Sequence, residues 1–357
     1  SGSEDPSDYR LQGRNYLAVT TLIRGSPVTD EVVRAFEREC ERLEMDAEYY
    51  PGITPSEGRQ KNEIQGPEGA SYSYFYYAAQ KILSQDPTER REFFRDWAYE
   101  VAPPADDSPY FHNFFKWGSL GNFIEAYGSS FFRRMELGYL ILVLTLAEVS
   151  IAAFVLILLP LIVRRAGSGT HRRFPVFLHF AAIGFGFMFI EMVFIQKLSN
   201  FLGDPIYSAS AAITTILVFA GAASSIQKRI PLSPPVRIRI AAAAVVIYII
   251  ASIWALDPLL ELLIGYGTAV RYLFSMLMLL PVSFFMGWML PSGMERIETS
   301  KSDLVPWAWG VNGFTSVAAS PLAVLLSTSI GFSGVLLAAA LCYAAAGLSS
   351  FFHVSRS

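Results

Sequence analysis

Two long apolar runs lie back to back between residues 175 and 226, and they constrain the fold more than any other part of the sequence. The first run contains a carboxylate, Glu191, and the polar stretch from Asn200 to Pro205 separates it from the second. A run of about 20 apolar residues is long enough to cross the hydrocarbon core of a bilayer as a helix. A charged side chain at the centre of such a helix costs about 3 kcal/mol on insertion scales, so Glu191 is expected to face protein or water. The pattern predicts a membrane protein, and Glu191 is its first candidate functional residue.

The distribution of charge predicts two bodies. Of the 357 residues, 52% are hydrophobic and only 17% are charged, and the charges crowd into the first 135 positions. We therefore expect a soluble segment over residues 1–130 and a transmembrane helical bundle over 131–357. The net charge of -3 provides no basic field that would attract nucleic acid. The expected partners are the lipid bilayer and other membrane protein subunits.

The membrane body is predicted to contain about seven spans, because seven apolar runs of suitable length follow residue 136. Small residues at helix-contact spacing, Gly221 with Ser225 and Gly310 with Gly313, predict close approaches between the helices. The predicted spans are 137–163, 175–198, 205–226, 237–256, 268–290, 304–327 and 331–352.

The charges of the connecting loops predict an orientation. The loops after the first, third and fifth spans are basic, whereas the opposite loops contain Asp204, Asp257 and Glu261. The positive-inside rule then places the basic loops in the cytoplasm and the soluble segment outside it, although Arg133 and Arg134 argue the other way. The basic residues concerned are Arg164, Arg165, Arg172, Arg173, Lys228, Arg229, Arg237, Arg239, Arg296 and Lys301.

The soluble segment has an α/β pattern at its start. Residues Tyr16 to Ile23 form a β-branched run typical of a buried strand. Thr29 is a suitable N-cap for a helix, and apolar residues recur after it at helical spacing up to Leu43. Residues Ala47 to Tyr50 predict a second short strand, which makes one βαβ-like unit.

The rest of the soluble segment is predicted to contain a loop and two helices. Residues 53–70 are polar and Gly-rich, as in a loop. Helices are predicted near 72–84 and 87–99, the second with Pro87 at its first position. The Pro-rich stretch that follows contains Asp106 and Asp107, an acid pair that more simply predicts a turn.

Several polar motifs inside apolar runs resemble one bacterial family. The motifs are YYPG, PPADDSPYFHNFFKW, IEMVFIQKLSNFLGDPIYSASAAITTILVFAGAASS, FFMGWMLPSGM and VPWAWGVNGFTSVAASPLAVLLSTSIGFSGVLLAAALCYAAAG. They resemble the C-terminal part of the spermidine-synthase-like membrane proteins, which join a Rossmann-type aminopropyl- or methyltransferase-like domain to membrane helices. The resemblance implies a multi-pass protein of the bacterial inner membrane. It also implies a polytopic helical bundle preceded by a small α/β segment like the end of a Rossmann-type transferase domain.

The sequence departs from that family where a cofactor would bind. A transferase using S-adenosylmethionine needs a Gly-rich turn after its first strand, and residues 1–130 contain none. We therefore expect no cofactor in this chain and assign no catalytic or cofactor-binding residue. The sequence opens SGSEDPSDYR without an initiator Met, which favours a processed, engineered or truncated start.

Five polar residues within the apolar runs are the candidate site residues. Glu191 is either a proton or cation site or a structural carboxylate paired with Lys197 or Arg271. Glu148 in the first span is more simply structural, and Asn312 is expected to hydrogen-bond across helices. The four histidines share no ligand spacing, so no metal site is predicted.

Three functions remain open. The first, which the missing cofactor half and the predicted outward location favour, is a non-catalytic accessory subunit of a membrane complex. The second is the C-terminal membrane part of an aminopropyl- or methyltransferase. The third is a carrier for a small cation such as a polyamine, with Glu191 and Glu148 lining the path, in which Glu191→Gln abolishes transport.

Overall fold

The computed structural model describes residues 25–43, 47, 49–53, 63–65, 71–97, 99–110, 114–119, 121, 137–163, 174–299 and 304–351. Contacts divide the chain into two compact units, Ser1–Trp97 and Ala98–Ser357. The second unit thus begins well before residue 131, the start of the predicted bundle. The reason is that Asp107 and Tyr110 make hydrogen bonds to the last membrane helix, Asp107 to Phe332 and Ser333 and Tyr110 to Ser327.

The first unit contains three helices and one short hairpin among its described residues. These elements are α1 (Asp30–Arg42), β1 (Glu63–Gln65), β2 (Ser71–Ser73), α2 (Tyr74–Ile82) and α3 (Pro87–Asp96), with β1 and β2 antiparallel. The three helices confirm the predicted ones. The three-residue strand β1 lies inside the predicted loop 53–70, whose polar, Gly-rich composition does not indicate a strand.

The predicted βαβ-like unit is not seen in the described part of the chain. Its first strand, residues 16–23, lies outside the described residues. The prediction of a second strand at 47–50 is wrong, because residues 47, 49 and 50 have no regular structure. Tyr50 instead packs on α1: its ring lies 6.4 Å from that of Phe36, and its hydroxyl donates to Glu37 at 2.7 Å. The helix surface therefore binds the aromatic side chain that was assigned to a strand.

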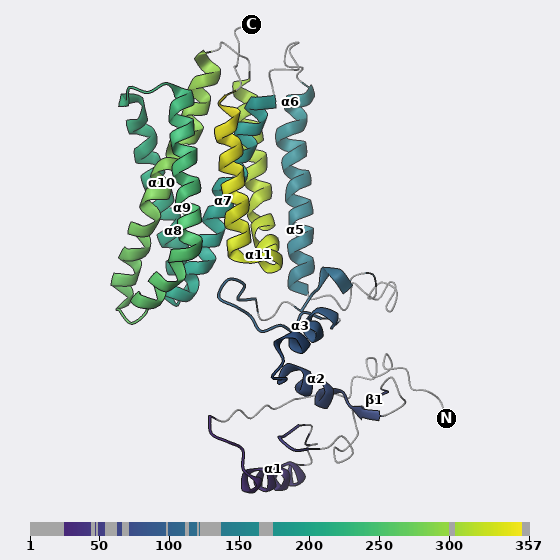
Figure 1. Cartoon of the computed structure of the whole chain (residues 1–357). Helices are drawn as coiled ribbons and strands as arrows, with labels where there is room; N and C mark the ends of the chain where they lie inside the picture. Colours follow the sequence, from purple (N-terminus) through teal and green to yellow (C-terminus); the bar gives the residue numbers. More distant parts are fainter. Residues whose placement is uncertain are drawn as a thin grey trace. The chain divides into compact units, whose positions relative to one another are not determined.

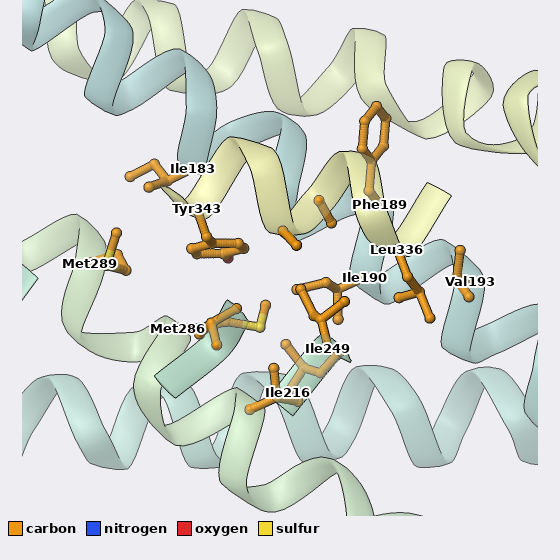
Figure 2. Packing of buried hydrophobic residues seen from close by; sticks show 14 of the residues in the cluster. Ile183, Phe189, Ile190, Val193, Ile216, Ile249, Met286, Met289, Leu336 and Tyr343 are labelled. Carbon is orange, nitrogen blue, oxygen red and sulfur yellow. The ribbon is translucent and has the colours of Figure 1, made fainter. Parts of the chain in front are cut away.

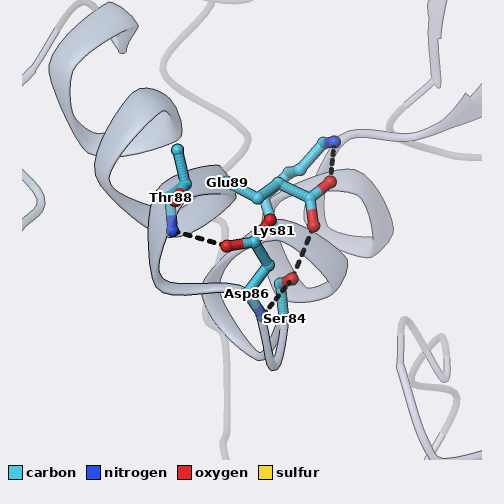
Figure 3. Close-up of polar contacts among 5 residues, drawn as sticks. All are labelled: Lys81, Ser84, Asp86, Thr88 and Glu89. Carbon is cyan, nitrogen blue, oxygen red and sulfur yellow. Dashed lines mark hydrogen bonds and ion pairs between the residues drawn. The ribbon is translucent and has the colours of Figure 1, made fainter.

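Polar contacts fix the start of α3 (Figure 3). The Asp86 carboxylate accepts a hydrogen bond from the backbone N–H of Thr88 at 2.7 Å, which satisfies one free donor of the first turn. Glu89 accepts hydrogen bonds from the Lys81 ammonium and the Ser84 hydroxyl, so the end of α2 is tied to the start of α3. The cap at Asp86 confirms the predicted helix start.

This cap is expected to weaken in acid. The Thr88 N–H holds the pKa of Asp86 below its ordinary value of 3.8, and Lys81 holds the pKa of Glu89 below 4.5. A depressed folded-state pKa stabilises the fold above the unfolded-state pKa, and this stabilisation is lost as the pH falls through the folded value. Hydrogen exchange of residues 84–97, corrected for intrinsic rates, should show lost protection below about pH 4. Asp86→Asn should reduce that pH dependence; equal protection of the wild type at pH 6 and pH 3 would contradict the assignment.

The second unit is a bundle of long apolar helices (Figure 1). Six helical segments among the described residues are long and apolar enough to cross a membrane. The first segment is α5 (Leu137–Ala153) with the π-helical stretch η4 (Phe154–Leu158), which continues into α6 (Leu159–Val163). The others are α7 (Phe174–Leu202), α8 (Pro205–Ile226) with the short η6 (Gln227–Arg229), α9 (Pro234–Leu263), α10 (Thr268–Thr299) and α11 (Val305–Ser349).

The last helix, α11, consists of two segments that run in opposite directions. As one straight helix its 45 residues would extend about 68 Å, roughly twice the bilayer core. Gly331 interrupts it with φ 72° and ψ 172°. On α7, Gly184 lies against Asn312 of the first segment and Gly186 lies against Tyr343 of the second. The chain therefore reverses at Gly331, and α11 covers the two spans predicted at 304–327 and 331–352.

A loop from the start of the second unit holds this reversal in place. The carbonyl of Asp107 accepts from the N–H of Phe332 at 2.8 Å, and its carboxylate accepts from the N–H of Ser333 at 2.9 Å. Asp107 thereby caps the segment that starts after Gly331, although it is more than 220 residues away. The predicted turn is present, since the N–H of Ser108 donates to the carbonyl of Ala105. The cap itself joins distant residues and has no local sequence signal.

The core of the bundle lies between α7, α8, α9, α10 and α11 (Figure 2). Ile190, Ile216 and Ile249 come from three of these helices and are fully buried. A close helix contact occurs at a glycine that the spacing did not single out: a Cβ on Gly287 of α10 would lie 2.7 Å from the Cα of Ala220. Gly221, in contrast, has no atom within 4 Å of that position. The spacing identified small residues but not the surface that each of them meets.

Candidate functional site

Two ion pairs mark opposite ends of the bundle. The ammonium of Lys197 in α7 lies 2.8 Å from the carboxylate of Asp257 in α9, and the guanidinium of Arg237 in α9 lies 2.7 Å from Glu295 in α10. Asp257 and Arg237 are 20 residues apart on one helix, which corresponds to about 30 Å, the thickness of a bilayer core. We call the end with Arg237 the basic end. Its described cations are Lys228, Arg229, Arg237, Arg239 and Arg296.

Glu191 does not have the partners that the sequence predicted. It is partly buried on α7, and the described residues provide no hydrogen bond or ion pair to it. Lys197 is paired with Asp257, and Arg271 donates to the carbonyl of Phe201 at 2.5 Å, so both predicted pairings are wrong. Six residues along a helix correspond to about 600°, which places Lys197 on a different face from Glu191. The ten residues from Glu191 to Phe201 place Arg271 about 15 Å further along α7.

Glu148 lies on an exposed face of α5. Only 6% of the residues in the most apolar window of this span are buried. Ile141, Leu144, Glu148, Ile151 and Val155 are all exposed, and their spacing of three and four residues puts them on one stripe of the helix. No hydrogen bond or ion pair from the described residues reaches Glu148. A carboxylate thus occupies the middle of an outward-facing apolar stripe.

Asn312 does not make the predicted bond across helices. Its backbone carbonyl accepts from the hydroxyl of Thr315 at 3.1 Å, but its side chain has no hydrogen bond to any described residue. Instead, Asn312 and Ser316 line a cleft between α7, α8, α10 and α11. The sequence could not indicate this cleft, because two separate parts of the chain, α7 with α8 and α10 with α11, contribute to it.

The cleft has a volume of about 1020 Å³, and its lining is apolar over most of its length and charged at one end. Most of its wall is apolar, and charged side chains gather at the basic end, where η6 and the end of α10 meet. The apolar wall includes Ile183, Phe187, Met188, Leu217, Met286, Met289, Leu290 and Met294, and the charged residues are Lys228, Glu295 and Glu298.

Two buried donors beside the charged residues lack partners. The Gln227 side chain accepts from the hydroxyl of Ser292 at 2.6 Å, yet its Nε2 has no described hydrogen-bond partner. Arg237 donates to Glu295 and to the carbonyl of Gln227, yet its Nε also has no described partner. Unpaired buried donors are uncommon in folded proteins, since each costs the free energy of a lost hydrogen bond. Both donors are buried behind the charged end of the cleft, and neither residue lines it.

The fold and its apolar helices define the class: this is a multi-pass helical membrane protein. No protein-family profile, curated protein sequence or solved structure matches the chain. The resemblance to the spermidine-synthase-like family therefore stays a prediction. Within the described ranges, no three His, Cys, Asp or Glu side chains gather as metal ligands would.

Proposed function

We propose that this protein is an accessory subunit of a membrane complex, and that the exposed stripe of α5 contacts a transmembrane helix of a different protein. The observation that supports the proposal is the position of Glu148. It is the eleventh of the 21 residues in the span Gly138–Leu158 and lies on the exposed face. The partner helix carries a basic side chain at the depth of Glu148.

The energetic argument concerns the cost of that carboxylate in lipid. An acidic side chain at the centre of a membrane helix costs about 3 kcal/mol on insertion scales, and other helices usually cover such groups. A basic side chain on a partner helix offsets this cost by forming an ion pair inside a medium of low dielectric constant. The neighbouring Ile141, Leu144, Ile151 and Val155 supply an apolar surface on which a helix can pack.

A symmetric dimer of this chain explains the stripe less well than a different partner does. A two-fold interface through α5 uses the same patch on both copies and brings the two Glu148 side chains toward each other. Two nearby carboxylates repel when both are charged. The stripe from Ile141 to Val155 contains no cation that could offset this repulsion.

The proposal predicts that a charge reversal at Glu148 dissociates the complex. Native membranes are solubilised in a mild detergent, and the mass of the particle that contains the 39.5 kDa chain is measured by native electrophoresis. The wild type should migrate as a larger complex. Glu148→Lys should lower the amount of the larger complex more than about 30-fold, because breaking a desolvated charge pair costs at least about 2 kcal/mol.

The matched control is Glu261→Lys, the same change at an exposed position near the end of α9. It should leave the complex intact. Both variants must reach the membrane in wild-type amounts, which immunoblotting of the membrane fraction checks. A wild-type chain that migrates alone, or a Glu148→Lys chain that stays in the complex, would overturn the proposal.

A further inference from the structure

The cleft between α7, α8, α10 and α11 is suited to a long apolar chain. Its wall includes four methionines, whose flexible side chains adapt to ligands of irregular shape. Leu217 and Trp309 line it while remaining 60% and 55% exposed on the outer surface of α8 and α11. The cleft is therefore continuous with the surface that faces lipid, and a chain can enter it sideways from the bilayer.

The charged end of the cleft offers one cation and one anion for a headgroup. Lys228 follows α8, and Glu298 is the second-last residue of α10; both are exposed, and no described residue makes an ion pair with either. The third charged residue, Glu295, is already paired with Arg237 at 2.7 Å. Trp309 lines the same cleft, and tryptophan is enriched at the level of lipid headgroups.

We propose that this cleft binds one zwitterionic phospholipid. The phosphate lies at Lys228 and the lipid ammonium at Glu298, with an acyl chain along Met286, Met289 and Met294. This site does not involve α5 and is independent of the partner helix proposed above.

The balance of charge distinguishes the zwitterion from other amphiphiles. Three charged side chains line the cleft, and one of them, Glu295, is neutralised by its ion pair with Arg237. One positive charge, on Lys228, and one negative charge, on Glu298, are left to face a headgroup. An anionic lipid would satisfy Lys228 but leave Glu298 facing a negative headgroup. A cationic amphiphile would satisfy Glu298 but be repelled by Lys228. Only a headgroup with both charges matches both side chains.

Native mass spectrometry of the purified full-length chain tests the proposal. Phosphatidylethanolamine and phosphatidylglycerol with identical acyl chains are added in equal amounts to the protein in detergent. The wild type should retain the ethanolamine lipid about fivefold more, the effect expected of one partly exposed charge pair. Glu298→Gln should abolish this preference, and Lys228→Gln should lower retention of both lipids.

A variant that fills the cleft tests the position of the acyl chain. Gly221 lines the cleft, and a Cβ added to it would have no atom within 4 Å, so Gly221→Leu starts in open space and adds bulk to the cleft. It should lower retention of both lipids at least about fivefold. The control is Arg229→Gln, the neighbouring exposed cation that does not line the cleft, which should behave as the wild type.

Each outcome decides the question. Equal retention of the two lipids by the wild type, or a preference for phosphatidylglycerol, would overturn the zwitterionic assignment. Unchanged retention in Gly221→Leu would overturn the location. Wild-type elution in gel filtration shows that each variant is folded, and Lys228→Gln and Glu298→Gln, at exposed positions, keep the test valid if Gly221→Leu fails to fold.

Discussion

Replacing Asp257 with leucine is expected to destabilise the bundle by about 3 kcal/mol, because it leaves the buried ammonium of Lys197 without its partner. Lys197 is only 5% exposed and lies 2.8 Å from the Asp257 carboxylate. The expected loss of stability is at the lower end of the range for breaking a buried ion pair, because the side chain of Asp257 is itself 39% exposed. Denaturant unfolding in detergent micelles, followed by tryptophan fluorescence, measures the change.

The double variant Lys197→Met with Asp257→Leu is the control for this prediction. Replacing both charges by apolar groups removes the uncompensated ammonium, so stability should return to within about 1 kcal/mol of the wild type. A single variant as stable as the wild type would show that the ion pair does not hold α7 and α9 together. A double variant no more stable than the single one would assign the loss to packing.

Replacing Gly331 with valine should cost about 2–4 kcal/mol of unfolding free energy, the sum of a backbone contribution and a lost cap. The backbone of Gly331, with φ 72° and ψ 172°, lies in a region that is almost restricted to glycine, and a residue with a side chain there costs about 1–3 kcal/mol. An added Cβ would also lie 3.0 Å from the carboxylate carbon of Asp107 and would displace this cap, which is worth about another 1 kcal/mol. The same denaturant unfolding measurement applies.

Gly203→Val separates the two causes. Gly203 also has a left-handed φ, 77°, but no atom lies within 4 Å of an added Cβ. It should therefore lose only the backbone contribution. The difference between the two variants should match the loss in Asp107→Ala; if Gly331→Val and Gly203→Val cost the same, Asp107 does not stabilise the turn.

The length of apolar runs predicted the bundle well, because crossing a bilayer imposes a minimum length on each helix. The run predicted at 175–198 became α7, residues 174–202, and the predicted boundary between the spans 304–327 and 331–352 coincides with the reversal at Gly331. Local capping signals were equally reliable: Pro87 begins α3 as predicted. These features depend on neighbouring residues only.

Features that depend on distant residues could not be predicted. Lys197 pairs with Asp257, which lies 60 residues away on another helix, and not with the nearby Glu191. The strand predicted at 47–50 failed for a related reason, since Tyr50 packs on Phe36 of α1. Gly221 has the spacing of a helix contact but faces the cleft. Sequence spacing indicates which residues share a helix face, but not what that face meets.

Photo-crosslinking from α5 tests the proposed complex most directly. Two variants of the chain are prepared, each with one photoreactive residue. In the first it replaces Ile151, which is 65% exposed beside Glu148, and in the second it replaces Ile247, which is 67% exposed on α9. The proposal predicts that position 151 yields an adduct with one protein, whose mass equals that of the subunit lost from the complex in Glu148→Lys. This adduct should disappear when Glu148→Lys is added to the crosslinking variant. Position 247 should yield lipid adducts only. Lipid adducts alone at position 151, or a protein adduct unaffected by Glu148→Lys, would contradict the role of α5 as the interface with a partner subunit.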